Sequence, residues 1–320
     1  VYRSVIRFSG RSAAIVAVGS VATLAALPFF IGPALLASLV ITFILFIAVL
    51  GLDVAMGYAG QVSLGQAGFM ALGGYASAIL ATNYDLAPAL GIIAGMALSL
   101  ICALLLSLVT TRLRGAYLAL ATLTFSLLID SLTVGLVDVT GGPSGLVGIP
   151  TLTLGPLALG TPRAMYYFVL ALIVFLVVAL YGGMRSSFGR ALHAIRADQT
   201  AAAALGINVP RYKMAAFAIS AVLASLSGSI YAFDFHFLSP YMVDTKRSFE
   251  MIAMLIIGGE GTLIGGLPGA ALITLLPTVF QPFAVYKSLA EGAILVLTFQ
   301  YLPDGLLGGA WRLGRWATAR

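Results

Sequence analysis

The sequence predicts an all-α, polytopic integral membrane protein with about ten transmembrane segments and both termini in the cytoplasm. Of its 320 residues, 61% are hydrophobic and only 9% are charged, whereas a soluble domain carries roughly a quarter charged residues. Apolar runs recur along almost the whole chain. They lack the apolar/polar alternation of a transmembrane β-barrel. We therefore interpret 1–320 as a single transmembrane domain.

Each crossing needs about 20 apolar residues. The candidate spans are 13–31, 34–52, 57–82, 86–109, 115–137, 164–181, 213–233, 248–258, 263–281 and 288–302. The first of them follows three arginines as a signal peptide would, but no soluble domain comes after it, so an uncleaved helix is expected. The segment 248–258 is too short to cross alone, so 248–281 either crosses twice or forms a re-entrant pair.

Basic residues set the orientation, because Lys and Arg collect on the cytoplasmic side. They cluster at the amino terminus, in the loop 182–213 and in the tail, whereas 138–163 is nearly uncharged. Ten crossings with the amino terminus inside place every cluster in the cytoplasm. The net charge of +6 then indicates contact with anionic membrane lipid and no role in binding nucleic acid.

The stretch "GYAGQVSLGQAGFMALGGY", residues 57–75, is rich in glycine within an apolar region. If it were helical, Gly57, Gly60, Gly68 and Ala71 would fall within about 80° of one another. Such a stripe suits close packing against another helix. The alternative is a broken helix that lines a solute path. A second glycine cluster, with Gly258, Gly259 and Gly261, favours the broken helix.

Polar residues within these spans are candidates for the translocation path. They are Gln61, Ser63, Gln66, Thr122, Ser126 and Asp130. The last three share one face of the fifth span with Thr133. An acid inside a span normally faces protein or water, so Asp130 has either a structural or a pathway role. Asp53 and Glu291 lie near span ends, where we expect solvation.

The loop "RSSFGRALHAIRADQTAAAALGINVPRYK" predicts one amphipathic helix on the cytoplasmic side. It would begin near Gly189, with Gly206 as the residue just after its end. Its apolar side would carry Leu192, Ile195, Ala202 and Leu205, opposite Arg190, His193, Arg196 and Thr200. Such a helix either rests at the lipid headgroups or docks a cytoplasmic partner.

Several catalytic motifs are missing from the sequence. There is no G-x-x-x-x-G-K-[ST] loop, no G-x-S-x-G nucleophile and no H-E-x-x-H helix. Two histidines and one cysteine predict no metal site. We therefore expect no enzyme and no cofactor in this chain, and any ATP would be hydrolysed by another chain.

Six segments together resemble one family over roughly 40–310. They are "GYAGQVSLGQAGFMALGGYASA", "LRGAYLALATLTFSLLI", "TGGPSGLVGIP", "SSFGRALHAIRADQTAAAALGINVPRYKMAAFAISAVLASLSGSIYA", "IIGGEGTLIGGLPGAALI" and "LPDGLLG". In this order they are similar to the permease subunits of branched-chain amino acid ABC transporters, LivM type, of the LivH/LivM family.

The resemblance implies a heteromeric importer in the bacterial cytoplasmic (inner) membrane. A second, LivH-type permease, two cytoplasmic ATPase subunits that bind ATP and Mg, and a periplasmic or lipid-anchored amino acid-binding protein would complete it. The coupling loop would use Arg190, His193, Arg196, Asp198, Ala203, Leu205 and Gly206. ABC permeases often carry an acid and two alanines just before this glycine. Here Asp198 is displaced, so docking would depend on shape and on Gly206.

The expected function is import of leucine, isoleucine or valine by alternating access. Relatives in the same family carry urea or short amides, which is one alternative. An ion-coupled secondary transporter with Asp130 as the coupling acid is another. A membrane-embedded enzyme is disfavoured, because no cluster of His, Cys or acids converges.

Overall fold

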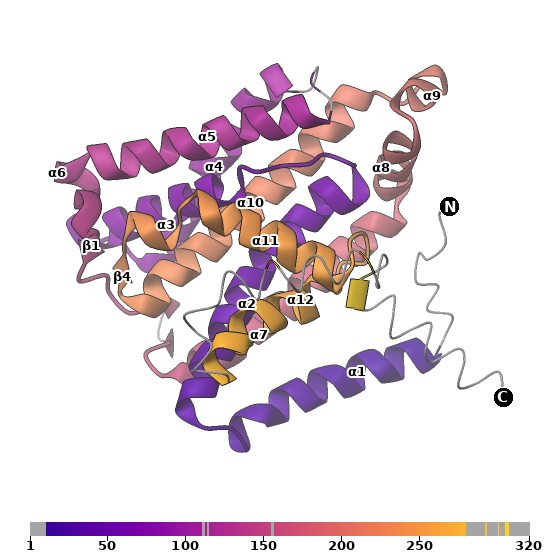
Figure 1. Ribbon diagram of the computed structural model, residues 1–320. Coiled ribbons are helices and arrows are strands. Elements are labelled where there is room, and N and C mark those ends of the chain that lie inside the picture. Colours follow the sequence, from indigo (N-terminus) through magenta and orange to yellow (C-terminus); the bar gives the residue numbers. More distant parts are fainter. Residues whose placement is uncertain are drawn as a thin grey trace.

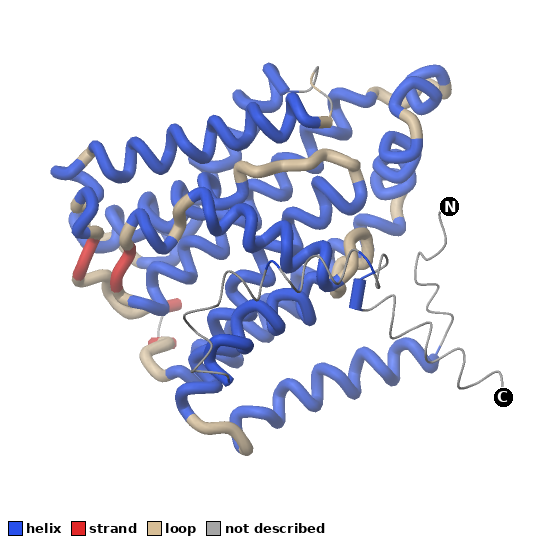
Figure 2. Tube along the Cα trace, viewed as in Figure 1, coloured by secondary structure: helices blue, strands red, loops and turns tan. Residues whose placement is uncertain are grey.

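The computed structural model describes residues 11–110, 113, 115–154, 157–279, 292, 300, 305 and 306. Within this part of the chain almost all regular structure is helical (Figures 1 and 2). The strands found there are two-residue pairs: β1 (Leu146–Val147) with β4 (Phe237–Leu238), and β2 (Thr153–Leu154) with β3 (Leu157–Ala158). The predicted all-α class is confirmed.

The described helices follow the predicted spans closely. They are α1 (Arg11–Ala26), α2 (Pro33–Leu52), α3 (Gln66–Asn83), α4 (Pro88–Thr110), α5 (Ala116–Gly135), α6 (Val137–Thr140), α7 (Pro162–Arg185), α8 (Ser187–Ala197), α9 (Gln199–Ala204), α10 (Val209–Phe235), α11 (Thr245–Gly258) and α12 (Gly266–Val279). Short 3-10 turns cover Leu27–Phe29, Gly142–Ser144 and Pro240–Met242. The candidate span 288–302 lies outside the described residues, apart from residues 292 and 300, as do Glu291 and most of the terminal arginines.

Five helical segments of the described chain are long and apolar enough to cross a membrane: 33–58, 88–110, 116–135, 162–185 and 209–235. The helices α11 and α12 have 14 residues each, or about 21 Å, against a hydrocarbon thickness of about 30 Å. The count of ten crossings and the cytoplasmic termini stay predictions.

The helices α2 and α10 form the centre of the bundle. About three quarters of the most apolar window of α2 is buried (72%), and 83% of that of α10, against 28–33% for α4, α5 and α7. The outer helices expose large apolar side chains such as Leu105, Leu128 and Phe175. Such a surface suits lipid or another membrane subunit.

Small residues allow α3 and α10 to approach until their backbones touch. A Cβ placed on Gly73 would lie 2.2 Å from the Ser225 carbonyl oxygen, and one on Gly228 would lie 1.9 Å from that of Met70. Any side chain at either position would force the two helices apart. This is the packing mode expected where helices associate within lipid.

Of the two alternatives for 57–75, the structure excludes one continuous helix and has the break. Helix α2 continues as a π-helical turn over Asp53–Tyr58. Residues 59–65 are then irregular, and α3 begins only at Gln66. Gly60 has a φ of +66°, a left-handed conformation that glycine adopts without strain. The glycine stripe therefore does not exist on one helix, and a break in the backbone replaces it.

A second break joins α11 to α12. Its residues, 259–265, include three with positive φ: Gly259 at +117°, Gly261 at +77° and Leu263 at +60°. The two helices pack closely, since a Cβ on Gly269 would lie 1.8 Å from the Met254 carbonyl oxygen. Glycine at these positions allows both the turn and the close packing.

The two ends of the bundle carry different structures (Figure 1). Helices α8 and α9 project from one end, and the loop between α11 and α12 lies near them. Helix α6 and the β1–β4 pair lie at the opposite end. Both glycine breaks are thus at the end that carries α8.

Candidate functional site

Side-chain hydrogen bonds anchor the first break to α10 and α5 and satisfy part of its irregular backbone. Gln61 donates from Nε2 to the Lys213 carbonyl oxygen at 3.0 Å. The Leu64 N–H donates to Thr122 Oγ1 at 2.9 Å, and the Gly65 N–H to Ser63 Oγ at 3.3 Å. Gln61, Ser63 and Thr122 are all buried. Non-helical backbone is tolerated at membrane depth only when it is buried and satisfied in this way.

Gln66 anchors the start of α3 to the two central helices. Its Nε2 donates to the carbonyl oxygens of Ala48 at 2.8 Å and Ser220 at 3.3 Å, and its Oε1 accepts from Ser220 Oγ at 3.1 Å. The Ala67 N–H donates to Ser248 Oγ of α11 at 2.9 Å. These bonds join the start of α3 to α2 and α10.

The predicted polar face of α5 is only partly turned toward α3. Thr122, Ser126 and Thr133 are buried, and a Cβ on Gly68 would lie 3.0 Å from the Ser126 Cα. Asp130 is half-buried at the edge of this face. The structure therefore gathers all of the candidate path residues except Asp130 around the first break and the start of α3.

Asp53 holds the second break to the end of α2, a role that the sequence analysis missed. It is 2% exposed, and its carboxylate accepts from the Gly261 N–H at 2.6 Å and from the Leu263 N–H at 2.9 Å. The expectation that Asp53 is solvated at a span end is wrong, because the second break folds over it. Gly57, one turn later, leaves room for the Asp53 carboxylate, since a Cβ on Gly57 would lie 2.0 Å from Asp53 Oδ1. The sequence pattern that could have indicated this role is an acid four residues before a glycine cluster.

Arg196, near the end of α8, contacts both breaks. Its Cγ lies 3.2 Å from the position of a Cβ on Gly60, and its Nη1 lies 3.4 Å from the position of one on Gly261. It also forms an ion pair with Glu260, inside the second break. A displacement of α8 would therefore reach both breaks directly.

The segment expected to form one helix, 189–206, forms two. Asp198 has an extended backbone (φ −158°) and caps α9, its Oδ1 accepting from the N–H groups of Thr200 at 2.7 Å and Ala201 at 3.1 Å. Asp side chains favour such caps over a helix interior. The predicted single helix is wrong for this reason.

Gly206 ends α9 as predicted. Its φ is +83°, its N–H donates to the Ala203 carbonyl oxygen at 3.0 Å, and the Ile207 N–H donates to that of Ala202 at 3.1 Å. These two bonds define a Schellman motif with glycine just past the end of the helix.

The tip of α9 is exposed, whereas α8 packs on the bundle. Leu192, Ile195 and Ala202 are buried as predicted, but Leu205 is 81% exposed, so its predicted place on the buried side is wrong. The break at Asp198 turns α9 away from the bundle (Figure 1). Ala203, Leu205 and Gly206 then form a small exposed knob.

The remaining polar residues of α8 act locally. Arg190 is exposed and donates from Nη1 to the Arg185 carbonyl oxygen at 3.1 Å, at the end of α7. The His193 ring lies 5.1 Å from the Tyr58 ring. Burial, and then the positive charge of Arg196, lower the pKa of His193. In the described part of the chain, no group of three or more His, Cys, Asp or Glu residues could hold a metal ion.

Comparison with known proteins agrees with this architecture. A family model described as "Branched-chain amino acid transport system / permease component" matches residues 34–299. The high-affinity branched-chain amino acid transport system permease protein LivM of Escherichia coli (strain K12) is 30% identical over 308 residues, 88% of this chain and 71% of that protein. No solved structure gives a significant match.

Permeases with other names match shorter stretches. The autoinducer 2 import system permease protein LsrC of Klebsiella pneumoniae is 31% identical over 133 residues, 38% of each chain. The xylose transport system permease protein XylH of Escherichia coli (strain K12) is 31% identical over 138 residues, 39% of this chain and 35% of that protein. Since the family model spans most of the residues and the bundle carries several helices able to cross a membrane, this chain is a multi-pass protein of the bacterial inner membrane and belongs to the permease components of branched-chain amino acid transport systems.

Proposed function

We propose that residues 1–320 form one permease domain of an ABC importer that moves leucine, isoleucine or valine into the cell. Two ATPase subunits, a second permease of the LivH type and a periplasmic or lipid-anchored binding protein complete the transporter in this proposal. The relative named for branched-chain amino acids covers 88% of the chain, whereas those named for autoinducer 2 and xylose cover less than half. This difference favours an amino acid as the solute.

The observation that carries the mechanism is the contact of Arg196 with both glycine breaks. In the proposal, the ATPases bind the coupling loop 182–213 at the knob of Ala203, Leu205 and Gly206. Their closure on ATP displaces α8, and Arg196 transmits this movement to Gly60 and Glu260. Asp53 makes α2 follow the second break, because its carboxylate holds two of that break's N–H groups.

Solute passes close to the first break in this proposal. Gln61, Ser63 and Gln66 are each at most 3% exposed here, so the path is closed at this level. Thr122 and Ser126 lie across from them on α5, and Asp130 lies beyond, toward the end of the bundle that carries α6 (Figure 1). Cysteines at Gln61, Ser63 and Gln66, placed in a Cys102→Ser background, should therefore react with thiol reagents during turnover and not at rest. Inaccessibility in both states would refute the path.

The deciding experiment is purification of the chain from native membranes with identification of the chains that come with it. We expect two P-loop ATPases, a second permease and a binding protein, whose ligand is then found by titration with leucine, valine, urea, short amides and xylose. A chain that purifies alone and drives uptake in ATP-free vesicles with an ion gradient would refute the proposal and favour an ion-coupled transporter.

A further inference from the structure

A buried hydroxyl without a described partner lies in the second half of α3, away from α8. The Tyr75 side chain is 4% exposed, and its hydroxyl has no hydrogen bond to the described residues. Leaving a buried hydroxyl unsatisfied costs about 1–3 kcal/mol. Buried polar groups are nearly always bonded, so a group absent from this chain is the expected partner.

Asp130 is the acid that faces Tyr75. Helices α3 and α5 run side by side in the same direction, because Gly65 packs on Thr122 and Gly68 packs on Ser126. One to two turns further along, Tyr75 comes beside Asp130, and the electrostatic field of its carboxylate reaches the Tyr75 hydroxyl.

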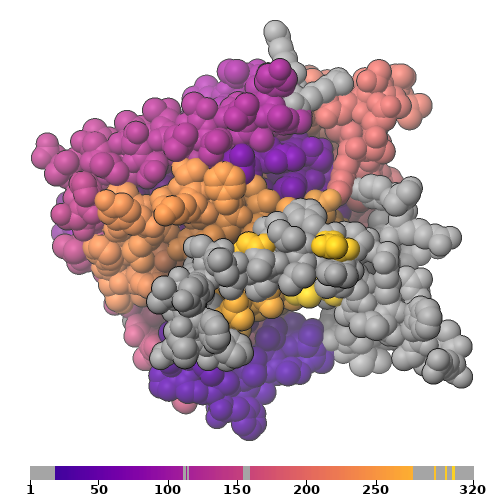
Figure 3. Space-filling model, in the orientation of Figure 1, coloured from indigo at the N-terminus to yellow at the C-terminus, as the bar shows by residue number. Residues whose placement is uncertain are grey.

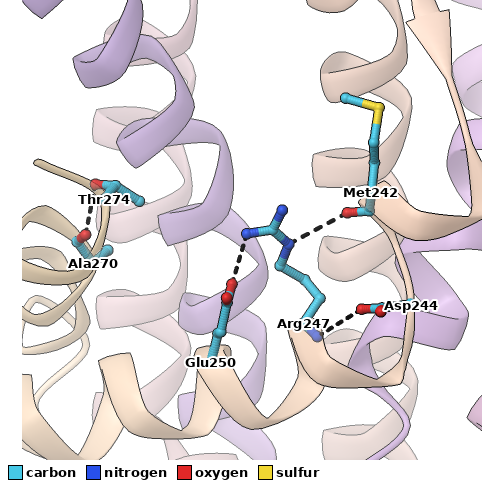
Figure 4. A network of polar contacts seen from close by, with 6 residues as sticks. All are labelled: Met242, Asp244, Arg247, Glu250, Ala270 and Thr274. Carbon is cyan, nitrogen blue, oxygen red and sulfur yellow. Dashed lines mark hydrogen bonds and ion pairs between the residues drawn. The ribbon is translucent and has the colours of Figure 1, made fainter. Parts of the chain in front are cut away.

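The Asp130 carboxylate has no partner of its own among the described residues. The ion pairs found there include Arg196–Glu260 and Arg247–Glu250, and neither of these involves Asp130. The nearby guanidinium of Arg247 is held by Glu250 at 2.7 Å and by the Met242 carbonyl oxygen at 3.3 Å (Figure 4). An acid at membrane depth is costly unless it faces water, a ligand or a counter-charge.

Helix α11 adds further acceptors to the same place. It lies beside α5 on one face of the molecule (Figure 3). At its start, the field of the Asp244 carboxylate reaches Asp130, and the neighbouring Thr245 hydroxyl oxygen is buried without a partner. Two acids and two buried hydroxyls without a described partner thus lie on three helices that pack together, α3, α5 and α11. Such a group suits a cation that donates several hydrogen bonds.

We propose that Asp130 and Tyr75, with Asp244 and Thr245 beside them, form a subsite for the ammonium group of the transported amino acid. An ammonium has three donors and a positive charge, which match the acceptors gathered here. The subsite lies on the side of the first break away from α8 and α9, so it would receive solute before the break opens. This inference rests on the proposed function, and it excludes urea, short amides and sugars as preferred solutes because they carry no ammonium.

The first test uses the whole transporter, purified with its partners and reconstituted in proteoliposomes. Asp130→Asn should lower leucine uptake about tenfold, the loss expected from one charge-assisted hydrogen bond. Tyr75→Phe should lower it several-fold, and Asp130→Glu should recover part of the loss. Asp138→Asn, at an exposed acid of α6, is the matched control and should leave both uptake and basal ATPase activity unchanged. All four variants should purify with the same subunits.

The second test measures local charge without relying on leucine transport. A thiol introduced by Thr133→Cys, in a Cys102→Ser background, should react at least tenfold faster with a cationic thiosulfonate than with an anionic one during turnover. Asp130→Asn should abolish this preference, and leucine should protect the thiol.

Equal rates, no reaction with either reagent, or normal leucine uptake by Asp130→Asn would overturn the subsite. The subsite would also be overturned if Asp130→Asn changed only the dependence of leucine uptake on sodium or on pH. If the wild-type transporter moves no branched-chain amino acid at all, the proposed function fails, and the charge preference of the introduced thiol still decides whether this place receives a cation.

Discussion

Replacing Asp53 with asparagine tests whether α2 and the second break are mechanically joined. The carboxylate accepts two backbone N–H bonds in a site that is 2% exposed. Hydrogen bonds to a charged group contribute about 1.5–3 kcal/mol each, and a neutral bond contributes about 1 kcal/mol. Asparagine keeps one acceptor and turns an NH₂ group toward the second N–H. The expected loss of stability is therefore about 2–5 kcal/mol.

The assay for Asp53→Asn has two parts. Denaturation of the purified transporter measures stability, and ATP hydrolysed per leucine imported measures coupling. We expect the variant transporter to assemble but to hydrolyse several times more ATP per leucine imported than the wild type, because α2 no longer follows the loop 259–265. Asp138→Asn serves as the control for charge removal. A change in stability below about 0.5 kcal/mol together with normal coupling would refute the reasoning, since Asp53 would then not hold the second break to α2.

Four further predictions follow from single contacts. Gly206→Leu should weaken ATPase copurification, because the left-handed backbone at this position costs a residue with a side chain about 1–2 kcal/mol. No atom of the described chain lies within 4 Å of an added Cβ there, and the same holds for Gly182, which is helical, so Gly182→Leu is the control. Arg196→Ala should leave the ATPases bound but lower uptake per ATP. Arg190→Ala, the control, should change neither ATPase binding nor uptake per ATP. Gly228→Ala should cost about 1–3 kcal/mol by overpacking α3 against α10, measured by denaturation against Gly135→Ala, which meets no atom within 4 Å. The fold lowers the pKa of His193 below its ordinary value of about 6.5, so the unfolded chain binds the proton more readily. The free energy of unfolding should therefore keep its full value above about pH 7 and fall on acidification. His193→Gln should remove this dependence on pH.

The membrane helices and their approximate ends could be predicted from the sequence, because apolar length alone determines them. The Schellman end at Gly206 was equally local, since glycine is the residue that tolerates its φ of +83°. The knob that carries it was predicted less well. Asp198 offered a cap to a second helix, and that short-range competition rotated Leu205 to the surface.

The links between elements could not be read from the sequence. Residues 53 and 261 are far apart in the chain, and only the fold reveals that the carboxylate of Asp53 satisfies the N–H of Gly261. The sequence suggested solvation for this acid because it stood at the end of an apolar run. Glycine clusters predicted where the backbone would break, but not which side chains would satisfy the freed N–H groups.

The chemistry of these links explains why both breaks sit at the end of the bundle that carries α8. A continuous helix transmits a push along its axis but does not change which polar groups it presents. A break can change its hydrogen bonds with a small displacement, because some of its N–H groups are held by single side chains such as Thr122 and Asp53. Placing both breaks against Arg196 lets one displaced residue alter both sets of bonds together. The Asp130 group lies beyond this level, so in the proposed mechanism a solute bound there would pass the first break only when α8 moves.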